Sequence, residues 1–264
     1  MKNALHTILL MLITVSLSAQ FKPGDIGYFP AMMEPYARMH VTTQVETKTD
    51  PSGWSTPYTR STFNESGWLT EVLYLQDSSL SEEERSPDMV DAFYYHADGR
   101  IRMIEMTGYD ILPIQYGFEY DKKNRLTASV IASAEAREYT YVLNKKEQVT
   151  QRFGKGARWV YADEQDTEGK LQMVPLDVTD YNWNADGLLA SEDYSYMGEW
   201  QHRIVYGYTP SGQLQSLQMY YDQGETAVPV FTTTYVYDAN GLLQTATTQE
   251  GADAFVSTFT YAFK

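Results

Sequence analysis

The sequence predicts an all-β protein of consecutive antiparallel β-hairpins that form one long curved sheet or an open or closed barrel. The chain of 264 residues contains 22 Tyr, 10 Phe and 5 Trp, and aromatic residues favour strands. No long segment shows the spacing of apolar residues that is typical of an amphipathic helix. A short phrase also recurs, in which two aromatic residues are followed by a turn that ends in Gly and then by Leu or Ile. A unit repeated in this way predicts one hairpin after another.

The turn within the recurring phrase explains its form. In the copy at 235–243, Asp238 opens the turn, and Gly241 stands where the backbone needs a positive φ. This order predicts a three-residue loop formed by a type I turn and a Gly bulge, with Asp238 opposite Leu242. The clearest copies are YVYDANGLL at 235–243, YNWNADGLL at 181–189, YGYTPSGQL at 206–214 and FYYHADGRI at 93–101.

That loop also predicts which residues face each other across each hairpin. We expect Tyr237 opposite Leu243, with both side chains on one face of the sheet. Two decayed copies of the phrase have Asn124 and Glu147 at the Gly position. The aromatic residues and the Leu of each unit should form one cross-strand cluster. The further pairs expected are Tyr235 with Thr245, Trp183 with Leu189, Tyr208 with Leu214, Tyr95 with Ile101, and Phe63 with Leu69.

A separate hairpin precedes the repeats. Residues 39–47 alternate like a strand with one buried face, and the segment 50–53 (Asp-Pro-Ser-Gly) has the composition of another type I turn with a bulge. No linker divides the remainder, so we expect a single β-hairpin repeat domain over 37–264. Residues 20–36 contain three prolines and predict an extended leader.

The N-terminal residues 1–19 have the pattern of a cleaved signal peptide. Lys2 is the only early charge, residues 8–15 are apolar, and the small residues at 16–19 suit signal peptidase. The apolar stretch is too short to span a bilayer as a helix. We therefore expect a secreted or periplasmic protein.

Cysteine usage and net charge exclude several classes of function. The sequence has no Cys, which excludes a lipoprotein anchor, disulfides, thiol chemistry and thiolate metal ligands. The formal net charge is −15 at pH 7, so the protein repels nucleic acid and anionic lipid headgroups. We expect neither nucleic acid nor a membrane as a partner, and the sequence does not indicate an oligomeric state.

Two copies of the phrase resemble the YD repeats of the RHS and teneurin-like family. In that family the repeats form a coiled β-sheet that can build a shell around a toxin. This chain is too short for such a shell, and its C-terminus does not look like a toxin, so the resemblance implies hairpin repeats alone. The chain is also similar to small secreted proteins of the Bacteroidetes type, some with open or porin-like barrels. The residues that match the YD repeats are Tyr237, Asp238, Gly241 and Leu243, and Tyr120, Asp121, Arg125 and Leu126.

Residues that would indicate catalysis are scarce. His40, His96 and His202 each stand alone in their segments, and the sequence has no HExxH, no GxSxG elbow and no Gly-rich loop before a helix. We therefore expect a non-catalytic protein without a cofactor. A glycan-active enzyme with an unrecognised carboxylate site is an alternative, since paired acids must converge in space.

One acidic segment resembles the first half of a calcium-binding loop. Glu164, Asp166 and Glu168 alternate before a Gly, as oxygen ligands do in such loops. Pro175 stands where the bidentate Glu should be. The segment is therefore either a metal site or a solvated turn.

Aromatic residues outside the phrase suggest a ligand-binding surface. Tyr194, Tyr196 and Trp200 flank one loop at the end opposite the Gly turns. Exposed rings give a large contact area for a carbohydrate or protein partner, and packing within the sheet is the alternative explanation.

A small outer-membrane β-barrel of the porin-like kind is a second alternative. Tight turns at one end and longer acidic loops at the other suit such a barrel. Glu105 and Glu192 lie within expected strands, however, where a charge facing lipid would be unfavourable. The favoured interpretation is a secreted or periplasmic binding or structural module built from YD-like repeats.

Overall fold

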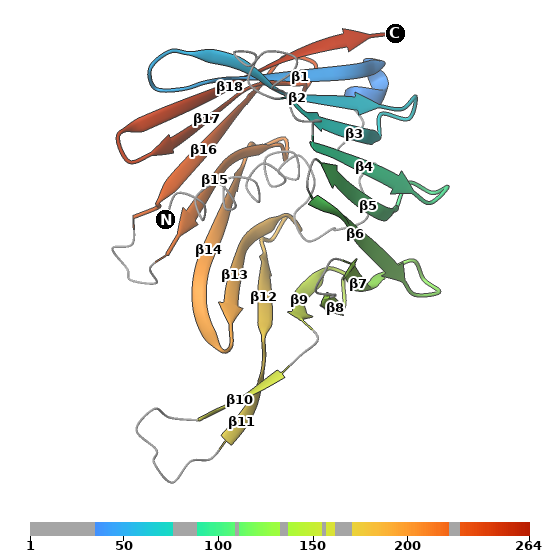
Figure 1. The fold of residues 1–264 in the computed structure, drawn as a ribbon, viewed down its shortest axis with the longest axis vertical. Coiled ribbons are helices and arrows are strands. Elements are labelled where there is room, and N and C mark those ends of the chain that lie inside the picture. Colours follow the sequence, from blue (N-terminus) through green and yellow to red (C-terminus); the bar gives the residue numbers. More distant parts are fainter. Residues whose placement is uncertain are drawn as a thin grey trace.

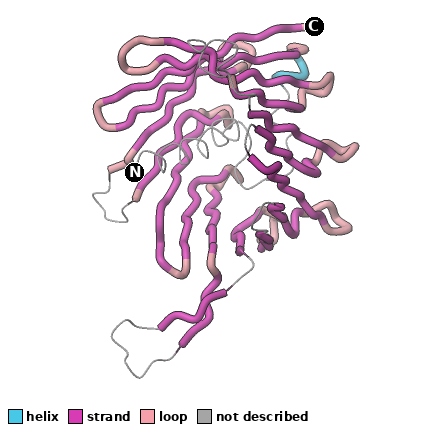
Figure 2. The backbone as a smooth tube through the Cα atoms, in the orientation of Figure 1, coloured by secondary structure: helices cyan, strands magenta, loops and turns pink. Residues whose placement is uncertain are grey.

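The computed structural model describes residues 35–75, 89–108, 111–132, 137–154, 157–161, 171–221 and 228–264. Strand covers most of this chain, with one helical turn at 35–38 (Figure 2). The strands are β1 (Val41–Thr49), β2 (Ser55–Phe63), β3 (Leu69–Tyr74), β4 (Met89–Tyr95), β5 (Ile101–Gly108), β6 (Ile111–Tyr120), β7 (Leu126–Ala132), β8 (Arg137–Leu143), β9 (Val149–Gly154), β10 (Ala157–Tyr161), β11 (Leu171–Pro175), β12 (Asp177–Trp183), β13 (Leu189–Tyr196), β14 (Glu199–Tyr208), β15 (Leu214–Tyr220), β16 (Phe231–Tyr237), β17 (Leu243–Glu250) and β18 (Asp253–Phe263).

Sixteen of these eighteen strands close into one antiparallel barrel. Each strand pairs with its neighbours in chain order, and β1 pairs with β18 to close the ring. The remaining two, β10 and β11, form a separate hairpin between β9 and β12 that projects from the barrel (Figure 1). The all-β fold built from hairpins is confirmed, and the sheet takes the closed form.

The tight turns follow the predicted chemistry. In the turn after β16, the Asp238 amide donates to the Leu242 carbonyl at 2.8 Å, and the Gly241 amide donates to the Asp238 carbonyl at 3.0 Å. The left-handed position has φ of 83° at Gly241, and Asn124 and Glu147 hold it at 64° and 63°. The described residues contain seven such turns at one end of the barrel, at 64–68, 96–100, 121–125, 144–148, 184–188, 209–213 and 238–242.

The predicted pairing register is confirmed next to the turns and wrong one step further away. Tyr237 pairs with Leu243, and the four equivalent pairs in the other hairpins also form. Tyr235, however, pairs with Ala246 rather than Thr245. A β-bulge inserts one extra residue on β17 after Leu243, which moves every later pair by one position.

The aromatic residue that ends a strand also links consecutive hairpins. The Tyr95 hydroxyl donates to the Leu69 carbonyl at 2.7 Å, and the Tyr237 hydroxyl donates to the Leu214 carbonyl at 2.9 Å. Each acceptor belongs to the residue that begins a strand after the preceding turn. The same bond is made by Tyr120 to Ile101, by the Trp183 indole to Val149 and by Tyr261 to Leu243. The phrase therefore stabilises both its own hairpin and the contact with the next one.

The buried side chains show which face of the sheet points inward. The described residues place no second sheet over the outer face of the barrel, so we assign a strand residue that is almost inaccessible to the interior. Leu69, Ile101 and Leu189 are fully buried, and the other buried strand residues share their face through the pairing register. The interior is consequently lined with Leu, Tyr, Phe, Ile and Met, which form two clusters, one around β1–β5 and one around β7–β17.

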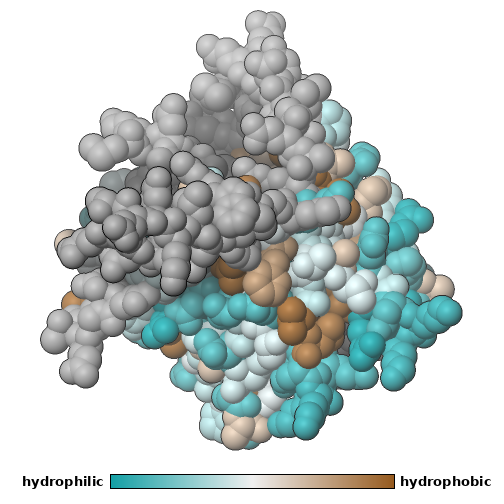
Figure 3. All heavy atoms as spheres, turned by 90° about the horizontal axis from the view of Figure 1, so that it is seen from below, coloured by the Kyte–Doolittle hydropathy of each residue, from teal (hydrophilic) through white to brown (hydrophobic). Residues whose placement is uncertain are grey.

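The outer wall is polar in comparison. Thr, Ser and Gln alternate with small apolar residues, and charged residues occur in mid-strand. Seen from below, the described surface is mainly hydrophilic, with hydrophobic residues in a few small patches (Figure 3). The outward charged residues include Arg60, Glu71, Glu105, Glu119, Glu138, Asp180, Asp193 and Arg203.

The helical turn at 35–38 packs at the end of the barrel that carries the tight turns. Tyr36 is buried, and its ring lies 4.8 Å from that of Phe63 and 6.1 Å from that of Tyr261. An Arg38 guanidinium nitrogen donates to the Asn240 carbonyl at 2.7 Å. The end of the expected leader is thus helical, whereas the expected signal peptide and the rest of the leader lie outside the described residues.

Candidate functional site

The inner wall of the barrel contains carboxylates that sequence reasoning did not single out as site residues. Glu46, Asp91 and Asp177 are buried, and Glu192 is half-buried. Three of them accept a hydrogen bond from a tyrosine hydroxyl. The bonds are Tyr74 to Asp91 at 2.9 Å, Tyr194 to Asp177 at 2.6 Å and Tyr206 to Glu192 at 2.7 Å. Acidic groups held by tyrosines on the inner wall of the barrel are the best candidate site in the described residues.

In one sector, the wall supplies its own positive charge. Arg152 on β9 points inward beside Tyr141, donates to the Thr179 hydroxyl at 3.0 Å and lies 4.8 Å from the centre of the Tyr139 ring. Burial raises the pKa of Glu192, and the Tyr206 hydrogen bond and the Arg152 charge oppose that rise. This Arg152 sector is therefore an internally balanced network.

In a second sector, a carboxylate lacks such a balance. Asp91 on β4 is 1% exposed, and its partners on the neighbouring strands are the apolar Val72 and Met106. Its Oδ2 atom accepts from Tyr74, whereas its buried Oδ1 atom has no hydrogen-bond partner. Burial raises the pKa of Asp91 to about 6, and the bond from Tyr74 opposes that rise only in part.

Glu46 and Lys48 on β1 lie at the edge of this Asp91 sector. Glu46 accepts from the hydroxyls of Thr59 at 3.0 Å and Ser257 at 2.6 Å. The Lys48 ammonium lies 3.4 Å from the centre of the Tyr58 ring. Burial lowers the pKa of Lys48, and the charge of Glu46 opposes this effect. Glu46 is therefore satisfied by groups on its own and adjacent strands.

The three aromatic residues expected to bind a ligand do not share one face. Tyr194 points inward, where its ring lies 5.0 Å from that of His202. Tyr196 is 40% exposed at the end of β13. Trp200 points outward, and its indole donates to Asp193 at 3.1 Å. A bulge between the Tyr194 and Ser195 pairings shifts the phase of β14 and separates Trp200 from the tyrosines.

The expected metal ligands cannot be placed. Glu164, Asp166 and Glu168 lie outside the described residues, as do most of the longer loops opposite the tight turns. Within the described ranges, no group of three or more His, Asp or Glu side chains is arranged to hold a metal ion. The calcium site stays a prediction.

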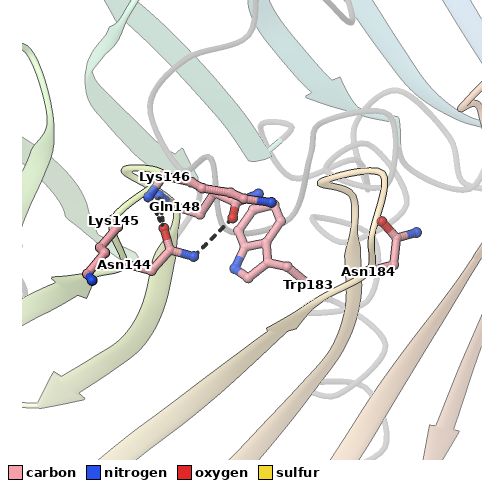
Figure 4. A pocket seen from close by; sticks show the side chains of 6 residues that line it. All are labelled: Asn144, Lys145, Lys146, Gln148, Trp183 and Asn184. Carbon is pink, nitrogen blue, oxygen red and sulfur yellow. Dashed lines mark hydrogen bonds between the residues drawn. The ribbon is translucent and has the colours of Figure 1, made fainter.

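A shallow pocket of about 350 Å³ lies at the tight-turn end of the barrel. Figure 4 shows Trp183 between the turn at 144–148 and Asn184. Its polar groups are mostly engaged, since the Trp183 indole donates to Val149 at 2.8 Å and the Asn144 amide donates to Gln148 at 3.0 Å. The pocket results from packing between adjacent turns, and it leaves fewer polar groups available to a ligand than the inner wall does.

The inward polar residues were difficult to find from the sequence because their phase depends on bulges. Glu192 falls on the face of Tyr181 only because a bulge intervenes between the Trp183 and Asn182 pairings. Arg152 pairs with Tyr141, an aromatic residue of a decayed repeat. A polar residue opposite a repeat aromatic is the one signal that could have identified both.

Comparisons with known proteins bear on the fold alone. No protein-family model matches the chain, and no curated protein is similar to it in sequence. Among solved structures it resembles a porin-like protein from Bacteroides uniformis ATCC 8492, with 12% identity and a TM-score of 0.52. The likeness covers 84% of this chain and 98% of that one. No helix in the described residues is long and apolar enough to cross a membrane. The chain is thus an all-β barrel similar in fold to a porin-like protein.

Proposed function

We propose that this chain is a non-catalytic binding protein of the cell envelope, which stands in water and binds its ligand at the inner wall of the barrel. The carrying observation is the distribution of side chains between the two faces of the closed sheet. The buried apolar and aromatic residues point inward, and charged residues such as Glu105, Asp193 and Arg203 point outward.

The outer wall supports an aqueous environment. A membrane barrel has an outward apolar band and a polar interior, whereas this barrel has charged residues on its outer wall and a cluster of buried apolar and aromatic residues on its inner wall. Glu105 pairs with Gln115 in mid-strand, and Asp193 pairs with Arg203. Charges at such positions would cost up to about 2–4 kcal/mol each at the bilayer midplane, with acids at the lower end. The strands β3 and β9 have six residues each, fewer than the roughly nine to eleven that span a bilayer.

The inner wall supports binding rather than catalysis. Catalysis by two carboxylates needs the two groups to flank one bond. In this barrel Asp91, Asp177 and Glu192 each bind a different tyrosine. Barrels of about sixteen strands are wide enough to leave an interior space. Tyrosine hydroxyls and carboxylates around such a space suit a polar ligand, and of the two partners that the sequence suggested, a carbohydrate or a protein, a carbohydrate fits this better.

An outer-membrane barrel is the second candidate. The closed ring of sixteen strands and the porin-like structural neighbour favour this alternative over an open YD-repeat module. In that case the outer wall would contact lipid in spite of its charges.

Tryptophan fluorescence with brominated lipid vesicles tests the proposal. Trp200 points outward, so lipid contact with the outer wall would quench its emission. We expect the full chain to be extracted without detergent, to remain unbound in a vesicle flotation assay and to show no quenching. Trp200→Phe is the matched control, since it removes an outward reporter on the barrel wall and leaves Trp54, Trp68, Trp159 and Trp183 in place. A component of the quenching that is present in the native chain and lost in this variant would establish the membrane barrel instead.

A further inference from the structure

Asp91 is a buried acid with an unused oxygen. Its side chain is 1% exposed, and Oδ1 has no hydrogen-bond partner although Oδ2 accepts from Tyr74. A buried acceptor without a partner is unfavourable, and native structures contain few of them. Because Val72 and Met106 on the adjacent strands are apolar, the wall itself does not supply the missing donor.

Tyrosines lie on more than one side of this acid. The Tyr74 ring that donates to Asp91 lies edge-on to Tyr58, with ring centres 6.4 Å apart. Tyr116 on β6 is also close, since burial together with the Asp91 charge raises the pKa of its hydroxyl. Rings beside a carboxylate form a site that favours a positive charge, because the ring face is electrostatically negative.

Elsewhere the inner wall combines these same groups with a cation of its own. Arg152 lies over Tyr139 near Glu192, and Lys48 lies over Tyr58 near Glu46. Of the charged groups that face Asp91 among the described residues, none is a cation acting directly on it. Tyr58 thus belongs to the Lys48 site, and among the described residues the Asp91 carboxylate, with Tyr74 and Tyr116 beside it, lacks a cation of its own.

We infer that the Asp91 sector binds the ammonium group of a small organic amine, with Oδ1 accepting from the ammonium and the rings of Tyr74 and Tyr116 beside it. This inference rests on the proposed binding role of the inner wall and specifies the ligand class. An ammonium supplies both the missing donor and the missing charge, whereas a neutral hydroxyl supplies the donor alone.

The pH dependence of binding follows from the same geometry. The titratable groups around the acid are Tyr74, Tyr58 and Tyr116, and Glu46 and Lys48 lie at the edge of the sector. The tyrosines stay neutral below pH 9, because burial raises their pKa values. Asp91, with a pKa of about 6, is the group that titrates between pH 5 and 7. Amine binding should strengthen as the pH rises through this range.

Benzylammonium and benzyl alcohol test the inference, because they have the same ring and differ in the charge of the donor. Binding to the full chain would be measured by ligand-observed NMR at pH 5 and pH 8. We expect benzylammonium to bind at least about tenfold more tightly than the alcohol at pH 8, with the preference reduced at pH 5. Asp91→Asn keeps the shape of the side chain and should abolish the preference. Glu71→Gln, an outward acid on the adjacent strand, should leave it unchanged.

The outcomes separate this inference from the proposed function. Equal binding of the two compounds, or a preference that survives in Asp91→Asn, would overturn the amine site. Binding of a neutral glycan without binding of benzylammonium would overturn the amine site and support the proposed function. Quenching by brominated lipid that depends on Trp200 would overturn the aqueous barrel, whatever the amine does. Circular dichroism of Asp91→Asn establishes that a loss of binding does not come from unfolding.

Discussion

The two acidic sectors of the inner wall differ in how their charge is compensated. Glu192 has a tyrosine donor and the guanidinium of Arg152 nearby, whereas Asp91 has a tyrosine donor alone. Asp91 is fully and Glu192 partly removed from water, which is unfavourable for an ionised carboxylate unless other groups replace the lost hydration. The difference indicates that the Arg152 sector serves stability. In the Asp91 sector, the Oδ1 atom is left without a partner and can accept a hydrogen bond from a ligand.

Removal of the Arg152 cation should have the largest effect. Arg152→Met leaves Glu192 buried without a nearby positive charge, so we expect a loss of about 3 kcal/mol in the free energy of unfolding. Urea denaturation at pH 7 measures this change. The double variant Arg152→Met with Glu192→Gln should recover part of the loss. A double variant as unstable as the single one would show that the two charges are not coupled.

Asp91→Asn should raise the free energy of unfolding, whereas Arg152→Met lowers it. The folded pKa of about 6 lies above the ordinary value of 3.8, so the folded chain holds this proton more tightly than the unfolded chain. The resulting stabilisation is complete below about pH 4 and is lost as the pH rises through 6. We expect the variant to be about 2 kcal/mol more stable than the native chain at pH 8.

Urea denaturation between pH 4 and pH 8 checks this sign. The stability difference between Asp91→Asn and the native chain should grow with pH and level off above about pH 7. A native chain whose stability relative to the variant does not change over this range would show that Asp91 titrates normally.

The tyrosine links between hairpins allow a smaller and well-matched comparison. Tyr237 donates to the Leu214 carbonyl, whereas the buried hydroxyl of Tyr208 at the equivalent position has no partner. Tyr237→Phe should cost about 1 kcal/mol, and Tyr208→Phe should be neutral or slightly stabilising. Thermal unfolding of the two variants side by side gives the difference. Equal losses would mean that ring packing, rather than the hydroxyl bond, links the hairpins.

A substitution on the outer wall should have the smallest effect on the free energy of unfolding. Arg203 donates to Asp193 at 2.8 Å, but the arginine side chain is 48% exposed. Arg203→Gln should change the unfolding free energy by less than about 0.5 kcal/mol, because water replaces the lost interaction. A loss as large as that of Arg152→Met would contradict the assignment of the two faces.

The sequence by itself determined the hairpins. Asp238 and Gly241 specify their turn through local hydrogen bonds and a positive φ, and the equivalent turns form even where Asn124 or Glu147 replaces Gly. Tyr237 and Leu243 face each other because that turn fixes the first pair of the ladder. These features depend on residues a few positions apart, so they can be predicted from the order of the chain.

Only the tertiary structure decided closure and the composition of the site. β1 and β18 are separated by about 200 residues, and their pairing converts one face of the sheet into an interior. Bulges then fix which polar residues enter it, since each bulge changes the phase of the alternation by one position. Trp200 thereby turned outward and Glu192 inward. Asp91 is a candidate site because the residues that pair with it on the neighbouring strands, Val72 and Met106, are apolar and do not compensate its charge.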